Sequence, residues 1–153
     1  MLDGVFSDDR GDFPAGTYVR NPPGSSHAPH SEAGCRILVK LRQFHPEDLE
    51  PVVIDTTAES GWQSLGDGVE RLPLHAFGTE TVAMLRLRAG ARFELDGGDG
   101  GIEMLLVAGA ASVSGETLVP EAWLRLPRGS SAMLVATAAT TVWLKRGHLP
   151  AGS

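Results

Sequence analysis

Two stretches of this sequence decide its fold: GTYVRNPPGSSH, residues 16–27, and EAWLRLPRGSSA, residues 121–132. They lie within a longer internal match, in which residues 4–41 align with residues 109–146 without a gap at a constant offset of 105 positions. Self-similarity of this kind indicates a chain built from repeated modules. The identical positions are Gly4/Gly109, Ser7/Ser112, Arg20/Arg125, Pro22/Pro127, Gly24/Gly129, Ser25/Ser130, Ser26/Ser131 and Lys40/Lys145.

The composition predicts strands rather than helices. The 153 residues include 19 Gly and 10 Pro, mostly in short clusters, and 42% of the residues are hydrophobic. Such clusters mark tight turns between short strands, so we expect an all-β fold. Closure into a small barrel removes exposed strand edges, and we expect that closure here. A short helix is allowed only at HPEDLE, residues 45–50, where Pro46 suits the first helical turn.

Charge and targeting signals narrow the class of partner. The formal net charge of −6 argues against a phosphate-binding surface, so we expect no nucleic-acid partner. No stretch approaches the roughly 20 apolar residues that cross a bilayer, and no secretory signal pattern is present. The single cysteine, Cys35, fits a reducing compartment and a buried structural thiol. We therefore expect a soluble cytoplasmic protein without a membrane partner.

The first copy of the repeat contains a candidate metal ligand. Pro22 stops a strand and fixes a turn, Gly24 permits backbone angles that a Cβ forbids, and the next strand points His27 to one side. In a barrel that side can be the interior, where a neutral imidazole suits Zn²⁺, Fe²⁺, Mn²⁺ or Ni²⁺. His30 could join His27 only where the strand bends, because a spacing of three sends side chains to opposite faces. His27 is the first candidate ligand and His30 the second.

The segment around His27 resembles the second signature of the cupin superfamily, G-x5-P-x-G-x2-H-x3-N. Gly16, Pro22, Gly24 and His27 stand at its first four fixed positions with the family spacing, and Ser31 stands where the family has Asn. The resemblance implies an RmlC-like cupin β-barrel, or jelly roll. It also implies zinc or another divalent transition metal in the first module.

The wider sequence resembles one kind of cupin. Residues 5–44 are similar to the cupin module of ChrR-type anti-sigma factors and their stand-alone relatives, and residues 61–75 resemble the start of another such module. Cupins take two His and one Glu from an earlier signature, G-x5-H-x-H-x3,4-E-x6-G, which in the opening copy would precede residue 1. A late start, a misassigned start and a natural short form are all left open. The resemblance implies the C-terminal half of a first module in 1–42, a connector in 43–61 and a complete second module in 62–148.

The second module has lost most of the cupin ligands. Against the earlier signature, Asp96 stands at the first His, Gly98 at the second and Glu103 at the Glu, while Ala132 stands at the final His. Two carboxylates fall short of the three protein ligands of a catalytic zinc, so we expect no metal there. We expect Asp96 and Glu103 on the two strands of a hairpin. The remaining histidines are interpreted as solvent-facing or loop residues: His45, His75 and His148.

The resemblance implies a non-catalytic sensor or regulatory module. In ChrR-type proteins a zinc-bound cupin acts on an N-terminal domain that holds a sigma factor, and this sequence has no such domain, so we expect no sigma binding. The alternative is a metal-dependent dioxygenase-like enzyme that uses His27 with ligands from a second chain or a preceding segment. The open faces of a half module predict that residues 4–41 pack against the complete module or against a second subunit, which favours a homodimer. A small-molecule ligand is left open.

Overall fold

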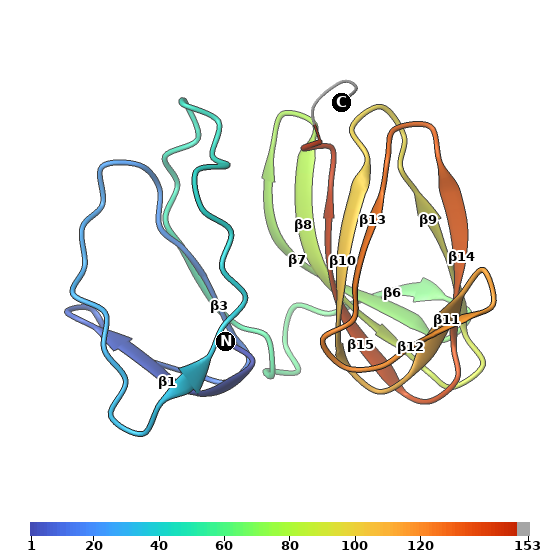
Figure 1. Cartoon of the computed structure of the whole chain (residues 1–153), viewed down its shortest axis with the longest axis horizontal. Coiled ribbons are helices and arrows are strands. Elements are labelled where there is room, and N and C mark those ends of the chain that lie inside the picture. The colour runs from blue at the N-terminus through green and yellow to red at the C-terminus, as the bar shows by residue number, and fades with distance from the viewer. Residues whose placement is uncertain (150–153) are drawn as a thin grey trace. The chain divides into compact units, whose positions relative to one another are not determined.

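The computed structural model describes residues 1–149, and every regular element in them is a strand. The chain divides into two compact units, Met1–Glu59 and a second unit that begins at Ser60 (Figure 1). No helix in the described part is long and apolar enough to cross a membrane. The helix allowed at residues 45–50 is only a turn, in which Asp48 N–H donates to the His45 carbonyl at 2.9 Å.

Unit 2 consists of two antiparallel sheets. One is six-stranded in the order β13-β10-β15-β8-β7-β6, and the other is four-stranded in the order β12-β11-β14-β9 (Figure 1). The strands are β6 Gln63–Gly66, β7 Val69–Phe77, β8 Glu80–Leu87, β9 Arg92–Asp96, β10 Ile102–Ala108, β11 Ala111–Val113, β12 Glu116–Leu118, β13 Trp123–Leu126, β14 Ser131–Ala136 and β15 Thr140–Arg146.

The core of unit 2 lies between these two sheets. Along β10, every second residue faces this core, as the two-residue period of a strand requires, and Ile102, Met104 and Leu106 are completely buried. Leu95 of β9 and Leu134 of β14 are equally buried and come from the opposite sheet. The interior is therefore filled with aliphatic side chains, and the expected all-β architecture is confirmed.

Unit 1 has little apolar core. Its strands are β1 Asp3–Asp8, β2 Gly11–Pro14, β3 Thr17–Arg20, β4 Cys35–Arg36 and β5 Val52–Asp55. They form a three-stranded sheet in the order β2-β1-β4 and a pair β3-β5. Phe13 is its one buried hydrophobic side chain; the other buried residues are Ser7, Asp8, Thr17, Arg20 and Asp48. Cys35, expected to be buried, is partly exposed.

The two copies of the repeat have the same strand pairing. In the hairpin β1–β2, Phe6 faces Phe13, and in the hairpin β11–β12, Ala111 faces Leu118, which is the same register at the offset of 105. A second pairing, later in each copy, is also equivalent. The bridge Ser7↔His30 of unit 1 corresponds to the pair Ser112↔Val135 of unit 2.

Both copies also place glycine at one close backbone crossing. A Cβ at Gly4 would lie 2.4 Å from the Gly34 carbonyl oxygen, and a Cβ at Gly109 would lie 2.0 Å from the Ala139 carbonyl oxygen. Both glycines have positive φ, at 70° and 88°. The identity at this pair of positions thus has a steric cause in each copy.

The copies diverge at their C-terminal strand. In unit 2 this strand is β15, which pairs with both β8 and β10 along its length. The corresponding residues of unit 1, 35–41, form only the two-residue β4, which pairs with β1. The same position in the repeat is therefore a central strand in one copy, whereas in the other it is a two-residue strand followed by residues to which no strand is assigned.

Candidate functional site

The signature loop of unit 1 forms the turn that its sequence predicts. After β3, the hydroxyl of Ser25 donates to the Pro22 carbonyl at 2.7 Å and the Ser25 N–H approaches the same oxygen at 3.2 Å. The Ser130 N–H makes the corresponding bond to the Pro127 carbonyl in unit 2, also at 3.2 Å. Gly24 has a φ of 86°, which explains the glycine at this position.

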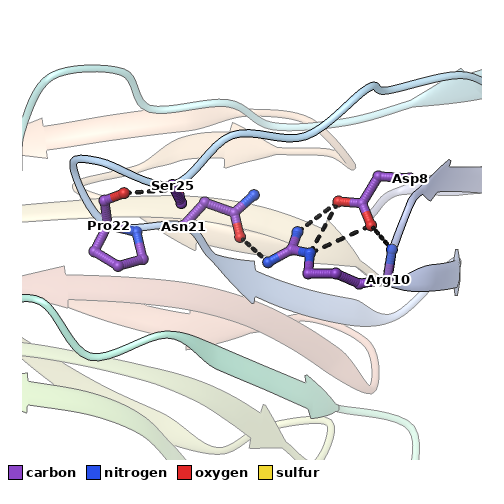
Figure 2. A network of polar contacts seen from close by, with 5 residues as sticks. All are labelled: Asp8, Arg10, Asn21, Pro22 and Ser25. Carbon is purple, nitrogen blue, oxygen red and sulfur yellow. Dashed lines mark hydrogen bonds and ion pairs between the residues drawn. The ribbon is translucent and has the colours of Figure 1, made fainter.

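A polar network joins this loop to the β1–β2 hairpin (Figure 2). The Arg10 guanidinium contacts the Asp8 carboxylate at 2.5 Å through Nη2 and donates through Nη1 to Asn21 Oδ1 at 2.8 Å. The backbone N–H of Arg10 donates to the same carboxylate at 2.8 Å. The Asp8 side chain is fully buried, whereas Arg10 reaches solvent, so the network is open on one side.

The charges of this network reinforce one another. Hydrogen bonding from the Arg10 side chain lowers the pKa of Asp8, and a smaller electrostatic contribution from His27 acts in the same direction. The same hydrogen bond raises the pKa of Arg10. The carboxylate and the guanidinium therefore stay ionised as a pair at neutral pH.

His27 and His30 lie close to this network. The His27 ring meets Phe6 edge-on, with 6.3 Å between ring centroids, and both histidine side chains are exposed. The backbone of His30 exchanges two 2.9 Å hydrogen bonds with Ser7. No group of three or more His, Cys, Asp or Glu residues in 1–149 could hold a metal ion. The donors of one chain thus do not fit the three-ligand metal site that the cupin resemblance implies.

In unit 2, Glu103 of β10 is buried and lies near an imidazole and a guanidinium group. His148 Nε2 lies 2.9 Å from its Oε2, and Arg125 Nε lies 4.0 Å from its Oε1. Lys145, the cross-strand neighbour of Glu103 on β15, is paired with Glu80 at 2.8 Å. The carboxylate at the family's glutamate position is therefore already engaged by protein groups.

The interpretation as a solvent-facing or loop residue is wrong for His75, which lies within β7 and is buried. His148 follows the end of β15 and so lies in a loop, as expected, but its side chain is buried. His148 comes from 45 positions beyond Glu103, a separation at which spacing gives no local signal. His45 is exposed, as expected.

The expected hairpin between Asp96 and Glu103 is also wrong. Asp96 ends β9, which pairs with β14 in the four-stranded sheet, whereas Glu103 lies on β10 in the six-stranded sheet. The glycine-rich link crosses between sheets, and the exposed Asp96 accepts a 2.9 Å hydrogen bond from the Gly98 N–H. Ala132, at the family's final histidine, packs against the core.

A buried ion pair in unit 1 was not expected from the sequence. The Arg20 guanidinium is paired with the Asp48 carboxylate, donates to the Glu50 carbonyl at 2.7 Å and lies 4.2 Å above the Phe44 ring. These contacts hold residues 44–50 against β3, within the segment expected to be a connector. Arg20 is shared with Arg125 of the other copy, but nothing in the sequence links it to Asp48.

Comparison with protein families gives a match over nearly the whole chain. A family model described as the ChrR cupin-like domain matches residues 1–45 and 50–150. The two stretches together contain both copies of the repeat. No curated protein sequence matches the chain.

Solved structures show the same fold at low sequence identity. A chain from the complex of Rhodobacter sphaeroides SigE with the anti-sigma ChrR matches with a TM-score of 0.50 and 18% identity, covering 56% of this chain and 47% of that chain. An RmlC-like cupin from Shewanella frigidimarina matches with 0.52 and 14%, covering 59% and 85%. The Schizosaccharomyces pombe Cnp3 cupin domain matches with 0.50 and 13%, covering 63% and 74%. The chain thus spans about half the length of the first match and has a cupin jelly-roll fold.

Proposed function

The chain belongs to the ChrR cupin-like domain family, and from this premise we propose that it is a non-catalytic cupin acting as a regulatory or sensing module. One observation carries the proposal: the barrel interior of unit 2, where a cupin would bind its ligand, is filled with fully buried aliphatic side chains. Small-molecule sites need a concave space lined with convergent polar groups, and here apolar packing fills that position. The engaged carboxylate of Glu103 supports the same conclusion.

We do not extend sigma-factor binding to this chain. The Rhodobacter protein is described in complex with SigE, but the likeness of 18% identity covers 47% of that chain and supports the fold alone. The role we propose is therefore regulation through a protein contact other than a sigma factor, with any small-molecule ligand bound outside the filled interior of unit 2. The compartment we propose is the cytoplasm, on the evidence of the single cysteine, Cys35.

The alternative is a metal-dependent enzyme similar to cupin dioxygenases. His27 is the residue of unit 1 that would contact zinc or another divalent transition metal, with His30 second, and the remaining ligands would come from a second chain or a preceding segment. The contact with Phe6 and the nearby charge of Asp8 place the His27 ring beside the polar network, which favours it over His30.

Metal analysis separates the two functions. The purified chain is titrated with Zn²⁺, Mn²⁺, Ni²⁺ and, without oxygen, Fe²⁺, and bound metal is measured after desalting. We expect far less than one equivalent, and the same amount in His27→Ala. The matched control is His45→Ala, which removes another exposed imidazole outside the signature loop. One equivalent of metal that is lost in His27→Ala but retained in His45→Ala would contradict the proposal, and oxygen uptake by the Fe²⁺-loaded protein would then support the enzyme.

A further inference from the structure

Arg146, at the end of β15, crosses from one sheet of unit 2 to the other. Val142 and Leu144 of the same strand face the core, so the two-residue period of a strand points Arg146 to the same side. Its guanidinium lies over the Phe93 ring, 5.5 Å from the ring centroid, and Nη2 donates to the Glu94 carbonyl at 3.4 Å. Both partners belong to β9, so Arg146 bridges the sheets at the outermost strand of the four-stranded sheet.

No carboxylate of the described chain neutralises this guanidinium. In residues 1–149 Arg146 forms no ion pair, and the Glu94 carbonyl is its one hydrogen-bond acceptor. Burial lowers the pKa of Arg146, the charge of Asp96 acts in the opposite direction, and the charge of Arg71 lowers the pKa further. A partly buried cation without an ion partner is costly, because it has lost part of its hydration. Arg146 therefore favours a counter-ion.

A second guanidinium approaches from β7. Arg71 lies opposite Leu85 of β8, which faces the core, so Arg71 starts from the same face of the six-stranded sheet as Arg146. Its Nη2 donates at 3.1 Å to Oε1 of Gln63, which is a neutral acceptor, and its side chain is exposed. The two cations repel each other, and an anion between them would turn that repulsion into attraction.

The charges around this pair indicate which anion fits. A guanidinium donates two parallel hydrogen bonds to a carboxylate or to a phosphate. With the carboxylate of Asp96 nearby, Arg71 and Arg146 together leave one net positive charge, which a monoanion neutralises. The protein as a whole has a net charge of −6, which further disfavours a dianion such as phosphate.

We propose that Arg146 and Arg71 bind a small organic monocarboxylate beside β9, with Arg146 as the bidentate donor and Arg71 as the second positive charge. The ligand lies outside the filled interior, because Ile102, the cross-strand neighbour of Arg146, remains completely buried by apolar packing. The site supplies a ligand class for the regulatory role. Its binding chemistry does not depend on that role, because neither His27 nor a protein contact takes part.

Titration of the full chain with sodium acetate tests the site, with ionic strength held constant by sodium chloride. Nitrogen-15 NMR of the arginine Nε–H groups should show saturable shifts at Arg146 and Arg71, with a dissociation constant in the millimolar range. Sodium phosphate at pH 7 should bind at least about fivefold more weakly, because a second negative charge meets Asp96. Shifts that do not saturate, or phosphate binding more tightly than acetate, would overturn the proposal.

Variants separate bidentate recognition from general charge, with the backbone amides of residues 93 and 94 reporting acetate binding. Arg146→Gln and Arg146→Lys should each weaken binding at least about fivefold, because an ammonium group cannot form the paired hydrogen bonds. Arg71→Gln should weaken it about threefold. Arg92→Gln is the matched control, since this exposed β9 arginine faces away from the core, and it should change binding less than about twofold.

Circular dichroism should show that all four variants remain folded. Unchanged binding in Arg146→Gln, or an equal loss in Arg92→Gln, would overturn the proposal. The metal analysis of His27→Ala does not involve this site, so failure of the carboxylate site and failure of the regulatory role are distinguishable.

Discussion

The two copies of the repeat, residues 4–41 and 109–146, fold alike but differ in what covers them. Both form the same hairpin in the same register and cross the chain at a glycine of the same position. In unit 2 the copy is one part of a complete two-sheet fold, and Val142 and Leu144 are buried within it, on a strand that pairs on both sides. In unit 1 the matching residues, Ile37 and Val39, remain exposed.

The side chains at equivalent interior positions of the two copies also differ in polarity. Val113 and Leu126 of unit 2 pack in or against the core, whereas the residues at their positions in unit 1 are Asp8 and Asn21, which Arg10 bridges. A barrel filled with apolar groups needs no polar partners, but a more open unit can keep a charged network in contact with water. The comparison shows that turns and strand register are the same in both copies where the backbone geometry requires particular residues. The interior side chains differ, and they are apolar only in the copy that other strands cover.

The largest difference in stability should appear when two equivalent side chains of the repeat, Leu144 and Val39, are each shortened to alanine. Leu144→Ala should lower the free energy of unfolding by about 2–5 kcal/mol, because it leaves a cavity in a closed core. Val39→Ala should change it by less than about 0.5 kcal/mol, because this side chain is half exposed. Urea unfolding at submicromolar protein concentration checks both variants. Tryptophan fluorescence follows unit 2, which holds all three tryptophans, and circular dichroism follows the strands of both units. Equal losses would mean that unit 1 has a core of its own.

The glycine crossings should come next and should behave alike. Gly4→Ala and Gly109→Ala each force a side chain into positive φ, at a cost of about 1–3 kcal/mol before any backbone clash is added. Gly24→Ala is the control for the clash, because it also has positive φ but a Cβ there meets no atom within 4 Å. Thermal unfolding by circular dichroism measures all three variants. Should Gly24→Ala cost as much as Gly4→Ala, conformation rather than close approach is the cause.

Exchanging the residues at the equivalent positions 27 and 132 should destabilise unit 2 but not unit 1. Ala132→His should destabilise unit 2 by about 1–3 kcal/mol, because the larger polar ring is pushed against a filled core. His27→Ala should cost less than about 0.5 kcal/mol, because the imidazole is exposed. Differential scanning calorimetry compares the two variants. A large loss for His27→Ala would show that unit 1 depends on this ring for its structure.

The smallest effect should be that of the polar network, and it should depend on pH. Asp8→Asn should cost about 1 kcal/mol or less at pH 7, since the solvent-exposed Arg10 weakens the charged hydrogen bond. The pKa of Asp8 is lowered in the folded protein, so this stabilisation is complete above its ordinary pKa of 3.8. It is lost as the pH falls through the lower folded pKa. Unfolding free energies from pH 7 to 2.5 should converge for wild type and variant; a constant gap would exclude the ionised carboxylate as the cause.

The sequence predicted the parts of the fold that depend on local geometry. The offset of 105 matched Gly4 with Gly109 and Pro22 with Pro127, and both pairs occupy equivalent turns or crossings. Turn residues act over a few positions, so their pattern is readable without tertiary information. The all-β fold class was predicted from the same pattern of Gly and Pro turn residues between short strands.

The sequence could not predict contacts that depend on distant chain segments. Glu103 and His148 meet across 45 positions, and Arg20 and Asp48 across 28, with no periodic pattern to link either pair. The hairpin expected between Asp96 and Glu103 failed for a related reason. A glycine-rich link can close a hairpin or cross between sheets, and the choice depends on which strands β9 and β10 find as neighbours.

The Arg20–Asp48 pair and the β3–β5 ladder join residues on both sides of the exposed Arg42. A protease that cuts after Arg42 would therefore sever the backbone while most of the contacts within unit 1 stayed in place. The nicked protein would run as one species in native gel filtration and as two bands after denaturation. Unit 1 is in this sense a natural site for fragment complementation, in which residues 1–42 and 43–153 could be produced apart and reassembled.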